Sequence, residues 1–253
     1  MKFKDKIVLV TGSSSGIGKE TAFQFATEGA IVIVHGPENN DELSESHQQI
    51  TQKSPKSIKM ACELSDSTAI RMMFSEIESQ FSRLDVLVNN AATQNSTPFL
   101  EMEEDNWDKI IAVNLKAPFL CSQLAAKMMI TQGGGKIINI GSVHEYQTKR
   151  NFIHYSTSKG GLVMLTKNLA LELAEYNIQV NQVAPGAIAT ALTDPDRQRQ
   201  FLSAVPAGRV GLPPEIASMV CYLASEEATY ITGTSFTVDG GLTLGFCASR
   251  PDL

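Results

Sequence analysis

The chain has 253 residues, and 43% of them are hydrophobic, which is enough apolar material for one large α/β domain with a sizeable core. The formal net charge of −6 argues against a nucleic-acid partner or an anionic membrane, because both surfaces repel an acidic protein. We therefore expect a small-molecule ligand. The first apolar run, at residues 7–10, is too short for a signal peptide or a membrane span, so the sequence predicts a soluble, cytoplasmic protein.

The four cysteines are far apart and form no CxxC pair. This spacing indicates neither a zinc site nor a disulfide framework, so we predict no metal site. Buried or neutral thiols are a simpler interpretation than functional ones. The cysteines are Cys62, Cys121, Cys221 and Cys247.

Short β-branched runs alternate with longer segments of helical period. We predict strands at residues 6–10, 30–34, 57–61, 84–88, 136–140, 178–183 and 235–238, and helices within 19–27, 66–81, 107–130, 155–175 and 214–224. A further polar helical segment contains His47. Near-continuous apolar strands separated by helices are typical of a parallel sheet covered on both faces, so we predict a doubly wound α/β fold of about seven strands.

The sequence does not indicate a division into smaller domains. There is no internal repeat, low-complexity tract or linker, so residues 1–253 are expected to form a single domain. The periodicity is weakest at 186–213, where a run of polar residues breaks regular structure. We interpret this segment as a loop over the substrate, although a long surface connection would have the same pattern.

A glycine-rich turn, TGSSSGIG at residues 11–18, follows the first predicted strand and opens the first predicted helix. Gly12 permits a tight turn, Gly16 lets the backbone approach a pyrophosphate, and Gly18 lets the helix pack close to the strand. The spacing differs from the GxGxxG fingerprint, so the strand-turn-helix context carries the prediction of a dinucleotide site. The predicted cofactor contacts in this turn are Gly12, Ser14, Ser15, Gly16, Ile17 and Gly18.

Tyr155 and Lys159 are four residues apart, about one helical turn, so the phenol and the ammonium project from the same face of a predicted helix. An adjacent cation stabilises a phenolate, so Lys159 is expected to lower the pKa of Tyr155 from its ordinary value of about 10 towards a range useful for proton transfer. Ser142, at the end of a predicted strand, would offer a hydroxyl to a substrate oxygen. Because Tyr and Lys often meet at this spacing by chance, other motifs must support a catalytic interpretation.

Such motifs occur in a characteristic order. Asn89-Asn90-Ala91 follows the fourth predicted strand, and Asn114, Ser142, the Tyr155–Lys159 pair and Pro185-Gly186 come after it. With the glycine-rich turn, this order and spacing resembles the short-chain dehydrogenase/reductase family over essentially the whole chain. The resemblance implies a Rossmann-type fold, a nicotinamide cofactor, either NAD(H) or NADP(H), and an oxidoreductase that interconverts a hydroxyl and a carbonyl group.

The resemblance also implies roles for individual residues. Tyr155 would be the general acid/base at the substrate oxygen, and Lys159 would lower its pKa and bind the nicotinamide ribose. Ser142 would orient the substrate oxygen. Asn114 would hold a water in a proton relay through Lys159, or alternatively would only satisfy polar groups at a helix irregularity.

The end of the second predicted strand reads the adenosine ribose in this family. His35-Gly36 resembles a variant of phosphate-accepting members, but it is followed neither by the Arg that would accept a 2′-phosphate nor by the usual Asp of NAD(H) enzymes. Carboxylates at Glu38, Asp41 and Glu42 favour NAD(H). Ala92 replaces a usual glycine and adds a Cβ near the cofactor. Besides the glycine-rich turn, Tyr155 and Lys159, the implied cofactor contacts are His35, Gly36, Glu63, Leu64, Asn90, Ala91, Ala92, Pro185, Gly186 and Ile188.

The sequences Ser142-Val143-His144-Glu145 and Asp239-Gly240-Gly241 resemble the glucose 1-dehydrogenase branch of the family. His144 and Gln94 would then bind hydroxyls of a sugar or polyol beside Ser142 and Tyr155, although both could simply fill polar loops. One alternative is a 3-oxoacyl-thioester (acyl-carrier-protein) reductase. Another is a catalytically silent cofactor-sensing or scaffold protein. A thioester reductase would use a basic entrance, for which the candidates are Arg150, Arg197, Arg199 and Arg209.

The resemblance further implies a homotetramer. The predicted helices at 107–130 and 155–175 would pack against partner copies, and the strand at 235–241 would lie at a second interface. The sequence shows only that these helices are broadly apolar. The C-terminal residues 246–253 could reach a neighbouring subunit or fray into solvent.

Overall fold

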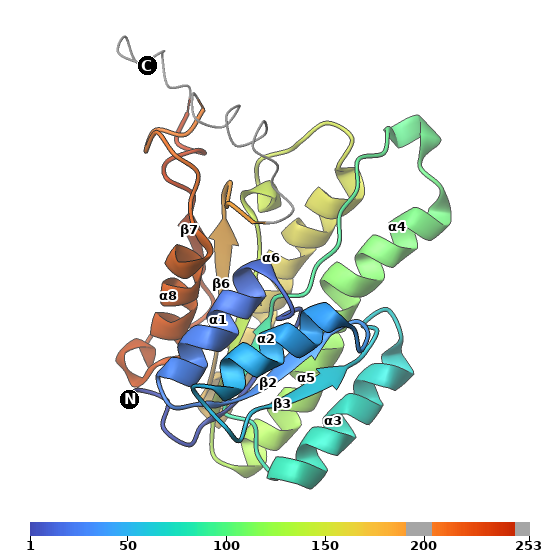
Figure 1. The fold of residues 1–253 in the computed structure, drawn as a ribbon. Helices are drawn as coiled ribbons and strands as arrows, with labels where there is room; N and C mark the ends of the chain where they lie inside the picture. Colours follow the sequence, from blue (N-terminus) through green and yellow to red (C-terminus); the bar gives the residue numbers. More distant parts are fainter. Residues whose placement is uncertain (191–203, 246–253) are drawn as a thin grey trace.

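The computed structural model describes residues 1–190 and 204–245, which contain one seven-stranded parallel sheet with helices on both faces (Figure 1). The strand order is β3-β2-β1-β4-β5-β6-β7, and every pairing is parallel. The predicted doubly wound, Rossmann-type fold is confirmed. The strands are β1 (Ile7–Val10), β2 (Ile31–Gly36), β3 (Ile58–Ala61), β4 (Val86–Asn89), β5 (Gly135–Ile140), β6 (Ile178–Pro185) and β7 (Ser235–Val238).

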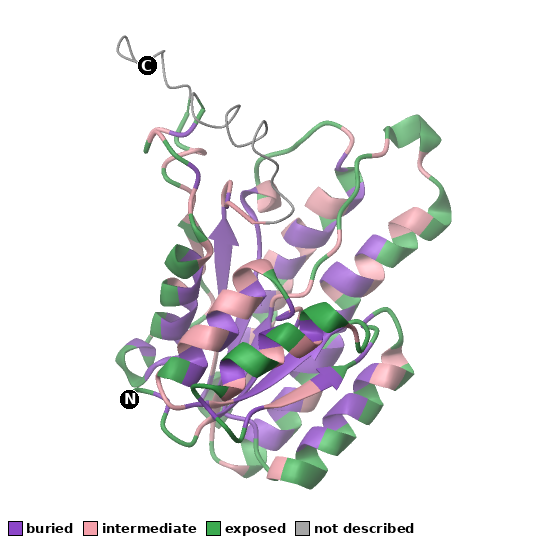
Figure 2. Cartoon of the chain, viewed as in Figure 1, coloured by how far each residue is buried: buried purple, intermediate pink, exposed green. Residues whose placement is uncertain are grey.

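Two hydrophobic cores lie on opposite faces of the sheet. Helices α1, α2 and α8 pack on one face, and α3, α5 and α6 pack on the other. Figure 2 shows the strands as mostly buried and the outer sides of the helices as exposed. The helices are α1 (Gly16–Thr27), α2 (Asp41–Thr51), α3 (Ser67–Phe81), α4 (Glu104–Ile111), α5 (Ala117–Thr131), α6 (Ile153–Leu173) and α8 (Pro213–Ala224), with short 3-10 turns η1 (Phe99–Glu101), η3 (Val143–Glu145), η4 (Ala174–Tyr176) and η5 (Glu226–Ala228).

The segment predicted as one helix at 107–130 is interrupted. Helix α4 is followed by a π-helical turn, η2 (Ala112–Lys116), before α5 begins. Pro118, near the start of α5, has no N–H to give to the carbonyl four residues earlier, and the wider turn accommodates this. The turn places Asn114 in the interior, where it is 1% exposed.

Some sequence predictions concern residues that the structure does not describe. Arg197, Arg199 and the centre of the predicted loop at 186–213 lie outside the described residues, as do Cys247 and the rest of the tail at 246–253. The other three cysteines are free and buried. Within 1–190 and 204–245, no group of three or more His, Cys, Asp or Glu side chains is arranged to hold a metal ion.

In the described part of the chain, none of the helices combines the length and the apolar character that crossing a lipid bilayer requires.

The sheet brings the predicted functional segments to one edge. In the observed strand order, β1 pairs with β2 on one side and with β4 on the other, so the direction of winding reverses between β1 and β4. Ligands of open α/β sheets bind beyond the carboxyl ends of the strands at such a reversal. The glycine-rich turn follows β1, Asn90 follows β4, Ser142 follows β5 and Gly186 follows β6 at this edge.

Candidate active site

The glycine-rich turn adopts a backbone that side chains would not tolerate. Gly12 and Gly16 have φ of +62° and +57°, in the left-handed region that favours glycine. A Cβ on Gly12 would lie 2.8 Å from the Cα of Ala91, and one on Gly18 would lie 2.3 Å from the carbonyl oxygen of Gly12. Close backbone packing therefore requires glycine at positions 12 and 18, and the positive φ favours glycine at position 16.

Helix α1 begins in this turn without a side-chain cap. Ser15 occupies the N-cap position but makes no capping hydrogen bond, which leaves the first N–H groups of the helix available to an anion. Ile17 packs partly buried against the core on the α1 side. Ser14 is 8% exposed, and its hydroxyl donates to Glu42 Oε2 at 3.3 Å. Helix α2 thus lies directly beside the turn.

Asn90 holds the turn from the next strand. Its Nδ2 donates to the carbonyl oxygens of Thr11 and Gly12, each at 2.9 Å. The hydroxyl oxygen of Thr11 accepts from the backbone N–H groups of Asn90 and Ala91 at 2.9 and 3.1 Å. Ala92 follows as an exposed residue without a positive φ, so its Cβ imposes no backbone strain.

His35 has a different position from the one expected of a cofactor contact. The ring is 1% exposed; Nδ1 accepts from the backbone N–H of Gly12 at 3.0 Å, and Nε2 lies 3.0 Å from the carbonyl oxygen of Cys62. Since a carbonyl only accepts, Nε2 carries the proton and both nitrogens are engaged. Burial lowers the pKa of His35 to about 4, so the ring is neutral at physiological pH. His35 thereby fastens the glycine-rich turn to the ends of β2 and β3.

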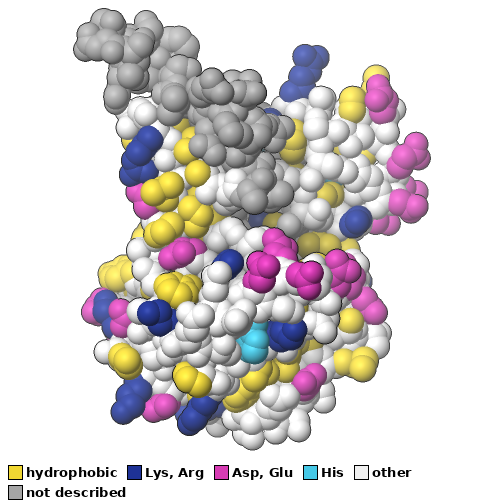
Figure 3. Space-filling view, in the orientation of Figure 1, with side chains coloured by type: hydrophobic (Ala, Val, Ile, Leu, Met, Phe, Trp, Pro, Cys, Tyr) yellow, Lys and Arg dark blue, Asp and Glu magenta, His cyan; other side chains and the backbone are white. Residues whose placement is uncertain are grey.

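The predicted adenosine site contains one cation that the sequence interpretation missed. Lys59 is far from Asn39 in sequence, but β3 pairs with β2, and Lys59 Nζ donates to Asn39 Oδ1 at 2.9 Å and to Ser44 Oγ at 2.8 Å. The signal is the pairing register of β2 and β3, which a single sequence does not specify. On the face shown in Figure 3, acidic side chains gather above α2, whose first turn contains Asp41 and Glu42.

The remaining predicted cofactor contacts lie at the ends of β2, β3 and β6. Gly36 ends β2 as a buried residue, Glu63 is exposed and accepts from the N–H of Ser65 at 2.9 Å, and Leu64 is 6% exposed in the core. Pro185 ends β6, and a Cβ on Gly186 would lie 2.7 Å from the Cβ of Asp239. Ile188 is 8% exposed and forms an isolated bridge with Gly211.

Ser142, Tyr155 and Lys159 converge at the carboxyl end of β5. Ser142 caps η3, and its Oγ accepts from the N–H of His144 at 3.2 Å. The Lys159 ammonium lies 5.7 Å from the centre of the Tyr155 ring and donates to the carbonyl oxygen of Ile140 at 2.8 Å. Lys159 is 2% exposed, so a cation is buried under a half-buried phenol.

The pKa of Tyr155 is shifted in the opposite direction from the one that the sequence predicted. Burial raises the pKa of Tyr155, and a hydrogen bond to Ser142 opposes this rise. Burial also lowers the pKa of Lys159 to about 8, while the charge of Glu145 acts in the opposite direction. The sequence predicted that Lys159 would lower the pKa of Tyr155. In the protein alone, desolvation outweighs any such effect, because the ammonium bonds to Ile140 instead of to the phenol.

Asn114 uses its side chain to stabilise the π-helical turn. Its Oδ1 accepts from the N–H of Thr93 at 2.8 Å, while Nδ2 donates to the carbonyl oxygen of Thr93 at 2.9 Å and to Ser158 Oγ at 3.2 Å. These contacts join the π-helical turn to the loop after β4 and to α6. They also place Asn114 beside Ser158, the neighbour of Lys159. Because the side chain of Asn114 is engaged in these contacts, the predicted relay would have to use the backbone of Asn114.

Of the two predicted substrate contacts, His144 lies beside the phenol. The rings of His144 and Tyr155 have centroids 6.0 Å apart, and His144 Nδ1 lies 2.8 Å from the carbonyl oxygen of Gln147. Gln94 is exposed on the loop after β4. The next residue, Asn95, accepts from His154 Nε2 at 2.6 Å, which ties this loop to the start of α6.

Known proteins match the chain along most of its length. A family model described as enoyl-(acyl carrier protein) reductase matches residues 12–243. A short-chain type dehydrogenase/reductase from Mycobacterium marinum has a solved structure that superimposes with a TM-score of 0.91 and 34% identity, covering 96% of this chain and 98% of that one. This chain belongs to the short-chain dehydrogenase/reductase family. It is therefore an oxidoreductase of a family that uses NAD(H) or NADP(H).

Two further relatives of this short-chain dehydrogenase/reductase have more specific names. The 3-oxoacyl-[acyl-carrier-protein] reductase FabG of Thermotoga maritima is 38% identical, over 96% of this chain and 100% of its own length. The acetoin dehydrogenase of Enterobacter cloacae has a solved structure with a TM-score of 0.88 and 39% identity, covering 100% of this chain and 98% of that one. Neither name supports the glucose 1-dehydrogenase branch in particular.

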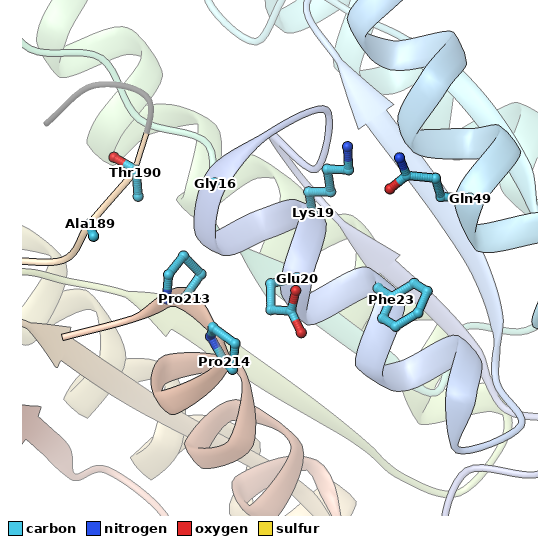
Figure 4. Close-up of a pocket in the computed structure, with 9 residues that line it drawn as sticks. All are labelled: Gly16, Lys19, Glu20, Phe23, Gln49, Ala189, Thr190, Pro213 and Pro214. Atoms are coloured by element: carbon cyan, nitrogen blue, oxygen red, sulfur yellow. The ribbon is translucent and has the colours of Figure 1, made fainter. Parts of the chain in front are cut away.

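The described residues of this family member fit a dinucleotide. A Cβ on Gly16 would have only Thr190 as a neighbour, 3.5 Å away, so there is open space beside this residue. The uncapped start of α1 faces the same space. A cavity of about 580 Å³ lies between α1 and the beginning of α8 (Figure 4), next to this turn. It is lined by Gly16, Lys19, Glu20, Phe23, Gln49, Ala189, Thr190, Pro213 and Pro214. None of Asn114, Ser142, Tyr155 and Lys159 lines it, so this cavity flanks the glycine-rich turn and lies apart from the catalytic candidates.

Proposed function

We propose that this short-chain dehydrogenase/reductase interconverts a secondary alcohol and the corresponding ketone in a small polar substrate, with Tyr155 as the general acid/base. The convergence of Ser142, Tyr155 and Lys159 at the end of β5 carries this proposal. Apolar side chains would stabilise this part of the core more than a buried hydroxyl, phenol and ammonium do, so packing alone does not explain these three groups. Their chemistry is that of proton transfer at a substrate oxygen.

Each of these residues has a defined task in the proposed reaction. Ser142 Oγ donates to the reacting oxygen and orients it, and Tyr155 Oη takes the hydroxyl proton during oxidation and returns it during carbonyl reduction. The Lys159 ammonium, held by the carbonyl oxygen of Ile140, keeps a positive charge beneath the phenol while the phenolate forms. When bound, the nicotinamide cofactor accepts or supplies the hydride.

The test of this proposal is Tyr155→Phe, which removes the transferable proton and retains the ring. We expect turnover to fall by about 10²-fold or more, while the dissociation constant for NADH, measured by cofactor fluorescence, stays within about twofold. Retention of full turnover would remove Tyr155 from the mechanism.

We further propose a substrate with a second hydroxyl next to the reacting carbon, such as an α-hydroxyketone, a sugar or a polyol. The support is the tautomer of His144. Because the carbonyl oxygen of Gln147 can only accept, Nδ1 carries the proton, and in this tautomer Nε2 is an acceptor. An acceptor 6.0 Å from the phenol, measured between ring centroids, favours a hydroxyl donor over a second carbonyl. The name of the acetoin dehydrogenase relative agrees with this class.

A panel of α-hydroxyketones, aldoses, polyols and 3-oxoacyl thioesters, followed by the absorbance of the reduced cofactor, tests the substrate class. His144→Ala should raise KM about tenfold for hydroxylated substrates and leave simple ketones unchanged. Activity confined to acyl thioesters would contradict the proposal.

A 3-oxoacyl-thioester reductase is the second candidate, because the Thermotoga maritima relative carries that name. A carrier protein would require free basic side chains at the entrance. Arg209, one of the residues considered for this role, is instead paired with Glu215 through two contacts of 2.8 and 2.6 Å. Arg150 is exposed. The pairing of Arg209 removes one of the four arginines considered for such an entrance.

For the cofactor we propose a preference for NAD(H). Glu42 lies beside the glycine-rich turn, where its charge would repel a 2′-phosphate, and the nearby cation of Lys59 is already bound to Asn39 and Ser44. Direct titration with NADH and NADPH tests this preference, and at least tenfold tighter binding of NADPH would overturn it.

We also propose that the protein is a homotetramer, as the family resemblance implies. Helices α5 and α6 expose large apolar side chains, including Phe119 (44%), Met164 (56%) and Leu171 (80%), which a partner copy would cover. Light scattering in solution tests this assembly, and a monomeric mass would contradict it.

A further inference from the structure

A carboxylate that the proposed mechanism does not use lies next to the catalytic lysine. Glu145 ends η3, the short turn that Ser142 caps, and it is half-buried. Among the described residues, no cation lies within ion-pair distance of it. A partly desolvated carboxylate without a paired cation is costly, so its retention at this point requires an explanation.

The carboxylate is held by two donors from neighbouring strands. Gln182 Nε2, on β6, donates to Glu145 Oε2, and Ser235 Oγ, on β7, donates to Oε1 at 2.8 Å. Burial raises the pKa of Glu145, and these hydrogen bonds oppose the rise. Since both partners donate, they favour the ionised form and fix both carboxylate oxygens in place.

Gln182 is itself positioned by a buried polar chain that crosses the sheet. Its Oε1 lies 3.2 Å from Thr166 Oγ1 on α6, which accepts from Asn139 Nδ2 on β5 at 2.8 Å. Asn139 Oδ1 in turn accepts from Asn89 Nδ2 on β4 at 2.9 Å. All four of these residues are at most 4% exposed. Gln182 therefore has little freedom to release the carboxylate.

Glu145 and Lys159 both approach the same stretch of backbone, at residues 140–141. Lys159 Nζ donates to the carbonyl oxygen of Ile140, and the position of a Cβ on the next residue, Gly141, is 2.9 Å from Glu145 Oε2. From the other direction, a Cβ on Gly160 would meet the backbone oxygen of Glu145 at 3.6 Å. The charge of Glu145 opposes the burial that lowers the pKa of Lys159.

We propose that Glu145 is a positioning residue that keeps the positive charge on Lys159, by means of a carboxylate that Gln182 and Ser235 orient beside the catalytic helix. The role of this charge in turnover rests on the proposed function. The electrostatic coupling itself does not, and it can be measured without substrate or cofactor.

Few other titratable groups face Lys159. On its own helix the neighbour is Tyr155, and η3 contributes His144 in addition to Glu145. Strand β5 presents the carbonyl oxygen of Ile140, β6 and β7 present the uncharged Gln182 and Ser235, and η2 presents Asn114 through Ser158. Glu145 is thus the one carboxylate among these contacts within the described ranges.

The direct experiment is an NMR titration of protein labelled with ¹³Cε-lysine, in the absence of cofactor, with the Lys159 signal assigned from its loss in Lys159→Met. Lys159 should titrate near its pKa of about 8 in the wild type. In Glu145→Gln it should titrate about one pH unit lower. Glu172→Gln makes the same charge change at an exposed position on α6 and should leave the titration unchanged. Identical titration in Glu145→Gln and the wild type would overturn the proposal.

Glu145→Asp is a second variant, which keeps the negative charge. Its side chain is one methylene shorter, so the charge lies further from Lys159. Its Lys159 pKa should fall between those of the wild type and Glu145→Gln, and an unchanged value would overturn the proposal even if Glu145→Gln does not fold. In turnover, the alkaline limb of kcat/KM for ketone reduction should move to lower pH by about one unit in Glu145→Gln, a change that a purely structural contact would not produce. Full activity of Tyr155→Phe would refute the proposed function but would leave the NMR result unaffected.

Discussion

The glycine-rich turn and the start of α6, which carries Tyr155 and Lys159, lie at the same edge of the sheet, but different interactions hold them. The turn is held by backbone geometry: glycines at positive φ, and the side chains of Asn90 and His35 bonded to main-chain atoms. The region around Lys159 contains buried charge, with Lys159 and Glu145 both close to the backbone at the end of β5. Steric fit makes the first region intolerant of added atoms, whereas electrostatics makes the second sensitive to lost charge.

Removing the buried cation should have the largest effect on activity. Lys159→Ala deletes the donor to Ile140 and the positive charge under the phenol, so kcat/KM should fall by about 10³-fold and cofactor binding should weaken as well. Steady-state kinetics and fluorescence titration separate the two effects. Weaker binding with unchanged kcat would show that Lys159 acts only on the cofactor.

Adding one methyl group to the turn should have the next largest effect, and it should act on stability. Gly18→Ala would place a Cβ 2.3 Å from the backbone oxygen of Gly12 and from Asn90 Nδ2, so it should destabilise the fold by about 3 kcal/mol or more. In the control Gly160→Ala, the Cβ would meet only the backbone oxygen of Glu145 at 3.6 Å, and the helix should gain about 0.5–1 kcal/mol. Urea unfolding measures both, and equal stabilities would contradict the steric argument.

His35 connects the two kinds of interaction, because its ring is a titratable group that holds a backbone turn. Its pKa is lowered from 6.5 to about 4 by burial, so the unfolded chain binds the proton more readily than the folded one. The stabilisation is present above about pH 6.5 and is lost as the pH falls through about 4, by about 3 kcal/mol in total. In His35→Gln, thermal stability should depend less steeply on pH over this range. An unchanged slope would show that other groups dominate acid unfolding.

The smallest effect is expected at the edge of the nucleotide site. Glu42→Gln removes a charge beside Ser14, so the preference for NADH over NADPH should narrow by about threefold, and less at high salt. Glu45→Gln, at an exposed position on the same helix, is the matched control and should leave the preference unchanged. Equal effects of the two variants would indicate a general field and not a local contact.

Local patterns in the sequence predicted the elements that local physics controls. The strands and the main helices follow from apolar periodicity, and the common face of Tyr155 and Lys159 follows from four-residue spacing on α6. The need for Gly12 and Gly18 also follows from the strand-turn-helix context. The interrupted helix around Asn114 was missed, because its cause is the combination of Pro118 with a loop 21 residues away that bonds to Asn114.

The sequence did not predict the interactions between segments that are distant along the chain. Lys59 reaches Asn39 because β3 pairs with β2, and Glu145 is oriented by strands that lie 37 and 90 residues further along the chain. The direction of the Tyr155 pKa was also missed, since it depends on how deeply packing buries the phenol.

The sequence by itself determined the fold class, the family and the identity of the candidate catalytic residues, because these depend on periodicity and on spacing along the chain. Only the tertiary structure decided what surrounds each group: that His35 bonds to backbone on both sides, and that Glu145 lies close to Lys159. The physical reason is that desolvation and Coulomb interactions depend on distance and burial in space, and a linear sequence specifies neither directly.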